Sequence, residues 1–345
     1  MNFHESVKTG DLAFCVEILP QVSRTFALSI EALPEPLRRA IRTAYLLCRV
    51  VDTVEDEPDL PAADRARLFD EFRLLVRDAT ADPSAFEESF RRFPGASPDL
   101  DLCRGAGAPV REFRALAPEL REASRPHILE MADGMEEFVD RWGSPDELTA
   151  LHDLDDLRRY CYFVAGTVGN LLTDTFVAVE GERLPADVRD GLRARAVDFG
   201  LGLQMTNIVK DVAADRDRGW CFLPAEICER HGLTPAELTD PAHREAAMGV
   251  VRDVADAATD HLGRALEYTL LLPRDARDVR LFVLVPMALA FATLTLVRRS
   301  PAVLDGSGIK VSRATVAQVL MEAQQVVADD DGIRDLCRRA DALEI

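Results

Sequence analysis

The segment PEPLRRAIRTAYLLCRVVDTVEDE, residues 34–57, constrains the fold most, because its apolar residues recur at helical spacing. Pro36 suits a first helical turn, and Pro58 and Pro61 predict the end of the helix. Further helices are predicted over 63–79, 111–142 with an interruption near Pro126, 153–180, 186–215, 240–271, 278–299 and 312–329. Residues 93–109, rich in glycine and proline, predict a loop. Because no strand alternation, repeat or composition break is evident, we expect one all-α domain over 1–345.

Composition narrows the classes of function. The net charge of -19 argues against general nucleic-acid binding, which needs a basic face. Seven scattered cysteines without a CxxC pair are typical of small buried residues in a reducing compartment. The first ten residues lack a signal-peptide pattern, so we expect a cytoplasmic protein. The apolar run 281–297 contains Pro286 and favours a buried core helix, with peripheral membrane contact left open.

The first helix ends in a cluster of carboxylates. Tyr45, Arg49, Asp52 and Asp56 are spaced by four, three and four residues, so they share one helical stripe, with Glu55 beside it. Carboxylates this close repel one another unless a cation binds, and oxygen ligands of this kind suit Mg²⁺ together with substrate phosphates. The alternative is a solvated acidic helix end.

A second polar stripe follows about 155 residues later, in GLGLQMTNIVKDVAADRDRGWCFLP. Gln204, Asn207, Asp211 and Asp215 are spaced by three, four and four residues. Two such stripes facing each other would hold metal ions between them, and bound cations would let an acidic protein bind a diphosphate. Lys210 is interpreted either as a surface lysine or as a diphosphate contact.

Two shorter segments lie outside the stripes. Ser23 in SRTF is interpreted as a helix cap. Gly166 and Gly169 stand inside a predicted helix, where each costs about 1 kcal/mol relative to alanine. Either close helix packing or a local break that admits a ligand would explain them. Tyr160, which begins that stretch, is interpreted as a buried hydrogen-bonded residue or a catalytic one.

Taken together and in order, VSRTF, AYLLCRVVDTVEDE, YCYFVAGTVG and LGLQMTNIVKDVAADRDRGWCFLP resemble the motifs of the squalene and phytoene synthase family. LFVLVPMALAFATL, followed by GSGIKVSRA, looks more like the squalene synthase branch. The resemblance implies an isoprenoid synthase helical bundle with a central active-site cavity. It also implies Mg²⁺ and two molecules of farnesyl diphosphate, joined through a cyclopropyl diphosphate and then reduced by NADPH to squalene.

The resemblance also implies roles for particular residues. The metal ligands would be Asp52, Asp56, Asp211 and Asp215, supported by Glu55. The substrate contacts would be Ser23, Arg24, Arg49, Gln204, Asn207 and Lys210. Tyr160 would assist proton removal, Tyr45 would line the ionising pocket, and Phe282 would face the carbocations, because aromatic faces stabilise positive charge. Asn207 and Lys310 would lie near NADPH. We expect a monomer.

Four positions depart from the family pattern. Lys210 replaces the usual arginine, Tyr162 a common histidine, Trp220 an arginine, and Ser312 a basic residue. The last two weaken the expectation of NADPH use. An enzyme that stops at presqualene diphosphate, or that makes dehydrosqualene or a phytoene-type product, therefore stays open. A one-substrate terpene cyclase and a non-catalytic relative are further alternatives.

Overall fold

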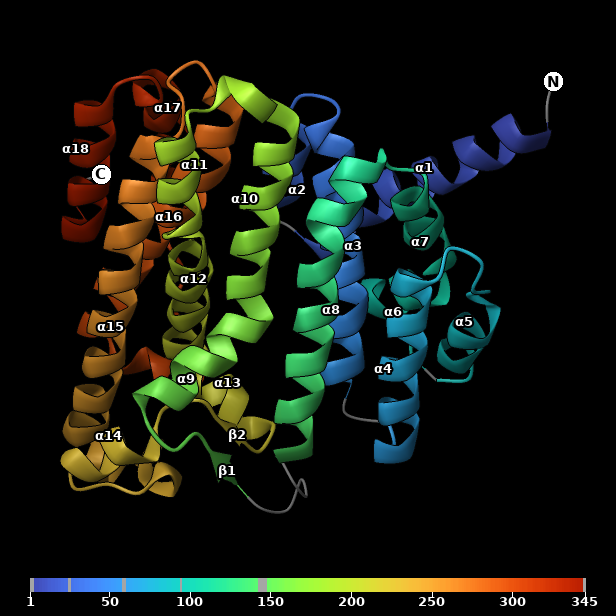
Figure 1. Cartoon of the computed structure of the whole chain (residues 1–345). Helices are drawn as coiled ribbons and strands as arrows, with labels where there is room; N and C mark the ends of the chain where they lie inside the picture. The colour runs from blue at the N-terminus through green and yellow to red at the C-terminus, as the bar shows by residue number, and fades with distance from the viewer. Residues whose placement is uncertain (1–2, 24–25, 58–59, 94, 142–147, 344–345) are drawn as a thin grey trace. The chain divides into compact units, whose positions relative to one another are not determined.

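The structure is a computed structural model that describes residues 3–23, 26–57, 60–93, 95–141 and 148–343. The fold is helical, as predicted (Figure 1). Backbone contacts divide the chain into two compact units, an N-terminal unit of 1–137 and 170–185 and a C-terminal unit of 138–169 and 186–345. The single domain over 1–345 stays a prediction.

The N-terminal unit is built on α3 (Leu37–Asp56), the helix predicted from residues 34–57. Its apolar side is buried against α1 (Phe3–Val22), α4 (Ala62–Arg77), α6 (Pro98–Arg104) and α7 (Gly107–Arg114). The other helical segments are α2 (Phe26–Glu31), α5 (Ser84–Arg91), most of α8 (Pro118–Arg141) and the later part of α10 (Thr167–Glu180). Buried aromatic side chains fill this core: Phe69, Phe72, Phe86, Phe90 and Phe113.

The C-terminal unit is centred on α12 (Ala196–Lys210), which packs along α15 (Arg244–Leu271) and α16 (Arg277–Arg299); the three run side by side in Figure 1. The other α-helices are α9 (Leu154–Cys161), α11 (Ala186–Arg193), α13 (Val212–Asp217), α14 (Ala225–Arg230), α17 (Arg313–Val326) and α18 (Asp330–Ala342). Two short strands, β1 (Thr149–Ala150) and β2 (Trp220–Cys221), pair in parallel, with Thr149 opposite Trp220.

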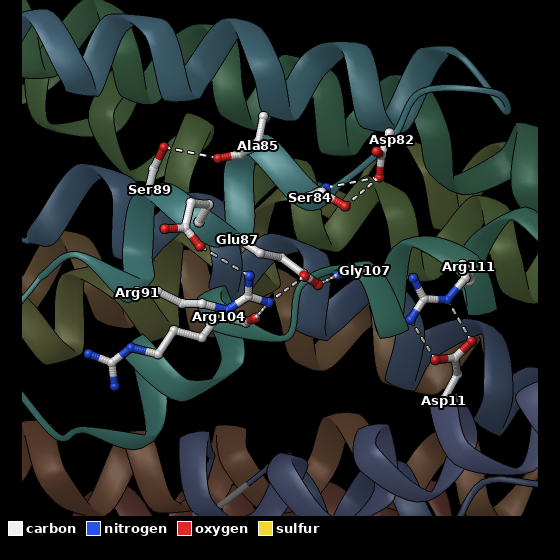
Figure 2. A network of polar contacts seen from close by, with 11 residues as sticks. Asp11, Asp82, Ser84, Ala85, Glu87, Ser89, Arg91, Arg104, Gly107 and Arg111 are labelled. Atoms are coloured by element: carbon white, nitrogen blue, oxygen red, sulfur yellow. Dashed lines mark hydrogen bonds and ion pairs between the residues drawn. The ribbon is translucent and has the colours of Figure 1, made fainter.

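The predicted loop over 93–109 is wrong in part, because α6 and the start of α7 lie within it. Ser97 caps α6 by accepting a hydrogen bond from the Leu100 backbone N–H, and Pro98 occupies its first turn. Figure 2 shows how α5 and α7 are joined nearby: a carboxylate oxygen of Glu87 accepts from the Gly107 N–H at 2.8 Å. Proline and glycine therefore mark helix starts here rather than a loop.

Two other helix predictions need correction. The described residues show no interruption near Pro126. Helix α8 continues through this position, and the side chains of Ser124 and Ile128 on either side of the proline are buried. Packing on both sides of a proline can outweigh the roughly 3 kcal/mol that the residue costs inside a helix. The single helix predicted over 186–215 is instead α11, α12 and most of α13, with the second break at Asp211.

Burial agrees with two further predictions. Two described helical stretches are long and apolar enough to cross a membrane, Leu154–Arg183 and Arg277–Arg299. The second contains the run 281–297 and is mostly buried within the C-terminal unit, as a core helix requires. All seven cysteines are free and buried, which confirms their assignment as small buried residues.

Candidate active site

The first polar stripe forms as predicted on the last turns of α3. Tyr45, Arg49, Asp52 and Asp56 are all partly exposed, whereas the intervening apolar residues are buried. Glu55 is only 5% exposed, so this carboxylate lies beside the stripe and within the protein. One side of α3 therefore presents a row of polar groups at its carboxyl end.

Charge on this stripe is only partly balanced. Arg49 forms an ion pair with Asp52 and donates from Nε to Oδ1 of Asp99 at 2.8 Å. Burial raises the pKa of Asp52, and the attraction of Arg49 opposes that shift. The pKa of Glu55 is raised well above its usual range, mainly by burial and further by repulsion from Asp56 and Asp52. A group of carboxyls held this way gains from a bound cation.

The segment before α2 packs beside the same stripe. Ser23 is buried and its Oγ accepts from the Phe26 N–H at 3.2 Å, so the predicted cap is confirmed. The rings of Phe26 and Tyr45 lie 6.2 Å apart between centroids. Burial raises the pKa of Tyr45, and a hydrogen bond with Ser23 partly offsets the shift. Arg24 lies outside the described residues.

The second stripe lies where α12 ends. Asp211 leaves the helical conformation, yet its N–H still donates to Asn207 O and its carbonyl accepts from Asp215 N–H, both at 2.9 Å. Lys210 forms an ion pair with Asp211 at 3.1 Å and is 30% exposed, so both interpretations of this lysine stay predictions. Burial, followed by repulsion from Asp211, raises the pKa of Asp215 to about 7. Gln204 is partly buried and Asn207 is exposed.

Glycines bring the continuous helical stretch Leu154–Arg183, which contains Tyr160, unusually close to α12. A Cβ added at Gly169 would lie 2.0 Å from the carbonyl oxygen of Ala196, and one added at Gly200 would lie 2.1 Å from that of Ala165. A π-helical turn over Tyr162–Gly166 interrupts the helix at this contact. Close packing, one of the two explanations offered by the sequence, is thus confirmed, and a local break is present as well. Whether a ligand approaches this backbone stays a prediction.

Tyr160 lies in an aromatic cluster at the end of α9. It is 6% exposed, its ring stacks on Phe222 with centroids 4.7 Å apart, and Phe138 meets it edge-on at 5.2 Å. A small cavity of about 10 Å³ borders the cluster, and Asp215, Trp220 and Phe222 are among the residues that line it. Phe222 therefore contacts both the Tyr160 ring and a hollow that reaches Asp215 of the second acidic stripe.

The other predicted residues of the C-terminal unit differ in exposure. Phe282 is buried in α16. Lys310 is exposed and follows Gly306 and Gly308, whose φ values of +77° and +73° require glycine. Ser312 caps α17 by accepting from the Thr315 N–H at 3.0 Å. The residue that replaces a basic group in the family pattern thus has a structural role.

The described residues place each stripe in a different unit. Asp52, Glu55 and Asp56 belong to the N-terminal unit, and Asp211 and Asp215 belong to the C-terminal unit. Among the described residues, no group of three or more histidine, cysteine, aspartate or glutamate side chains is arranged to hold a metal ion. The facing of the two stripes therefore stays a prediction.

Some site residues were missed from the sequence. Asp99, which contacts Arg49, falls in the segment predicted as a loop. Phe138 and Phe222 surround Tyr160 but carry no motif of their own. A signal for Asp99 was present in Ser97-Pro98-Asp99, which is a helix-start pattern.

Comparison with known proteins identifies the family of this chain. The model of the family described as squalene/phytoene synthase matches residues 19–315. Squalene synthase BSS of Botryococcus braunii is 31% identical over 327 residues, which cover 93% of this chain and 66% of that protein. The Botryococcus squalene synthase is 30% identical over 321 residues, which cover 92% of this chain and 64% of that protein. The chain thus spans slightly less than two thirds of the length of these two relatives.

Solved structures share the fold. TcSQS in complex with the ligand E5700 has a TM-score of 0.79 and 26% identity, covering 96% of this chain and 97% of that one. A dehydrosqualene synthase is similar in fold, with a TM-score of 0.64 and 22% identity. The match covers 93% of this chain and 97% of that one. The motifs, the helical fold and a family match over most of the chain show that this protein belongs to the squalene/phytoene synthase family.

Proposed function

We propose that this family member joins two molecules of farnesyl diphosphate head to head through presqualene diphosphate and reduces that intermediate to squalene with NADPH. The observation that supports this best is the pair of acidic helix ends. Each holds a carboxyl group, Glu55 or Asp215, and burial together with a neighbouring carboxylate raises its pKa. Such groups suit a substrate that arrives with divalent cations.

The donor set fits Mg²⁺. All the expected ligands are carboxylate oxygens, and the mutual repulsion described above would be relieved by a bound cation. Asp52, Glu55 and Asp56 would hold metal from one unit, and Asp211 and Asp215 from the other. Bound Mg²⁺ would supply charge neutralisation for the departing diphosphate.

The chain's own residues would then act on the two substrates. Arg49 and Lys210 would hold diphosphate oxygens, with Ser23, Arg24, Gln204 and Asn207 completing the contacts. Loss of one diphosphate gives an allylic cation, and the double bond of the second substrate forms a carbon–carbon bond to it. Release of a proton closes the cyclopropane ring, and the Tyr160 hydroxyl would assist that transfer.

The buried aromatic side chains would protect the cationic intermediates from water. Phe282 would present its ring to positive charge, and Tyr45 would line the pocket in which ionisation occurs. After the second diphosphate leaves, the rearranged cation needs a hydride, which NADPH would supply. Lys310 and the exposed Arg313 offer cations for its phosphate, and Asn207 would lie near the reductant.

A second candidate is an enzyme of the same family that omits the reduction, releasing presqualene diphosphate or dehydrosqualene. The observation in its favour is that Ser312 is engaged as a helix cap where a basic residue is usual. In either case we propose a monomeric cytoplasmic enzyme, with peripheral membrane contact for release of an apolar product.

One incubation separates these candidates. The purified chain is given farnesyl diphosphate and Mg²⁺, with and without NADPH, and extracted lipids are identified by mass spectrometry. Squalene that appears only with NADPH supports the first candidate. Presqualene diphosphate or dehydrosqualene at saturating NADPH supports the second, and the absence of any coupled product refutes both.

A further inference from the structure

Arg49 is shared between two carboxylates that have different surroundings. Its Nη1 donates to Asp52, one turn later on the same helix, and its Nε donates to Asp99 on α6 at 2.8 Å. The third guanidinium nitrogen, Nη2, is engaged by neither carboxylate. The arginine side chain is 33% exposed, so it lies at the edge of the unit where a ligand can reach it.

The two carboxylates would take different roles once a cation binds. Asp52 belongs to the acidic cluster with Glu55 and Asp56, whereas Asp99 comes from a different helix and pairs with Arg49 alone among the described ion pairs. A carboxylate shares its negative charge among the cations that it contacts. A metal ion bound to Asp52 would therefore weaken the ion pair between Asp52 and Arg49. The arginine would then keep only its bond to Asp99.

Asp99 is held firmly enough for this role. It lies in the first turn of α6, which Ser97 caps, and the following Leu100, Leu102 and Cys103 are buried. The Cys103 thiol lies 3.8 Å from the carbonyl of Val50, so α6 is fixed against α3 beside Arg49. An aspartate on such a support limits the directions in which a long arginine side chain can point.

We infer that Asp99 is a positioning residue, which retains Arg49 through Nε while Asp52 turns to the metal, and so aims the remaining guanidinium N–H groups at the diphosphate. The inference rests on the proposed function, because it assigns Arg49 to a diphosphate. Asp99 itself touches neither substrate nor metal in this scheme.

Binding of inorganic diphosphate provides the test, measured by calorimetry with and without Mg²⁺. Asp99→Asn keeps an oxygen that accepts from Arg49 but loses the negative charge, so Mg²⁺-dependent diphosphate binding should weaken about tenfold, the order of the difference between a charge-assisted and a neutral hydrogen bond. The KM for farnesyl diphosphate should rise by a similar factor, while kcat changes less than about threefold. Asp99→Glu should restore most of the affinity, because it keeps the charge.

Asp101→Asn is the matched control, since Asp101 lies on the same helix, is 56% exposed and pairs only with Arg104 among the described ion pairs. It should change diphosphate binding less than about twofold. In an Arg49→Met background, Asp99→Asn should add less than about twofold, because its effect passes through Arg49. Thermal melting without ligand checks folding; if Asp99→Asn melts early, a second neutral pair, Asp99→Ser against Asp101→Ser, replaces it.

Two results would overturn the inference: Asp99→Asn that binds diphosphate as tightly as Asp101→Asn, or an undiminished effect of Asp99→Asn in the Arg49→Met background. These are distinct from failure of the proposed function. If the wild-type chain binds no diphosphate with Mg²⁺ and converts no farnesyl diphosphate, the proposed function fails, and this inference fails with it.

Discussion

Replacing Gly169 with alanine should destabilise the C-terminal unit, although alanine is the better helix former. The new Cβ would lie 2.0 Å from the carbonyl oxygen of Ala196 and 2.9 Å from its carbonyl carbon. Because carbon–oxygen contacts of this kind occur at about 3.3 Å or more, the backbones would have to separate by roughly 1.3 Å. Neither partner atom can rotate away, since both belong to the backbone.

The size of the effect follows from two opposing contributions. Alanine gains about 1 kcal/mol over glycine inside a helix. Overpacking costs typically 1–3 kcal/mol, and a rigid backbone contact, reinforced here by Gly200 against Ala165, belongs at or above the upper end, roughly 3 kcal/mol. The net loss is about 2 kcal/mol, which for an unfolding entropy of roughly 0.7 kcal/mol/K in a chain of this length lowers Tm by about 3 °C.

The assay is thermal melting of the metal-free protein followed by circular dichroism. Gly263→Ala is the control, because Gly263 lies inside α15 and an added Cβ meets nothing within 4 Å. It should raise Tm by about 1 °C, from the helix preference alone. If Gly169→Ala melts at or above the wild-type temperature, the close approach is not rigid and the reasoning is refuted.

Four further predictions concern the site. Asp52→Ala or Asp211→Ala should abolish turnover while the far-ultraviolet circular dichroism stays that of the wild type; near-normal turnover in either would remove the metal assignment. Tyr160→Phe keeps the ring that stacks on Phe222 and loses only the hydroxyl, so formation of presqualene diphosphate should fall about 10²–10⁴-fold with little change in substrate binding, and an unchanged rate in single-turnover experiments would make Tyr160 structural. Lys310→Ala should raise the apparent KM for NADPH several-fold and shift output toward unreduced products without slowing the first half-reaction; product distribution against NADPH concentration checks this. Burial and Asp211 raise the pKa of Asp215 from 3.8 to about 7, so the folded protein loses the stabilisation that comes from protonated Asp215 as the pH rises towards 7. Asp215→Asn, melted in EDTA, should therefore raise Tm more at about pH 8 than at about pH 5. An equal gain in Tm at both pH values would contradict the raised pKa.

Much of the fold could be predicted from helical spacing alone. Leu37–Asp56 and Arg277–Arg299 match the predicted segments within a few residues, because each has a long apolar face that must be buried. The errors at the prolines came where a residue type has two uses. Pro98 begins a helix and Pro126 lies inside one, and only the packing around each decides between these outcomes.

The site was predictable where its residues lie on one helix and less so where they come from several. Tyr45, Arg49 and Asp52 share a face because of their spacing, and the structure confirms it. The contact of Arg49 with Asp99 joins residues from separate helices and depends on how α6 packs on α3, which periodicity does not encode. The same holds for the stacking of Phe222 on Tyr160.

The burial of every cysteine gives this chain a built-in set of unfolding reporters. Burial raises the pKa of each thiol, for example to about 12 at Cys48 and Cys337, so few thiolates are available to an alkylating reagent while the protein stays folded. Cys15, Cys48 and Cys103 belong to the N-terminal unit, and Cys161, Cys221, Cys228 and Cys337 to the C-terminal unit. Pulsed alkylation read by peptide mass spectrometry would thus follow the opening of each unit separately, with no engineered label. Labelling of both sets at one rate would mean that the two units open as a single cooperative body.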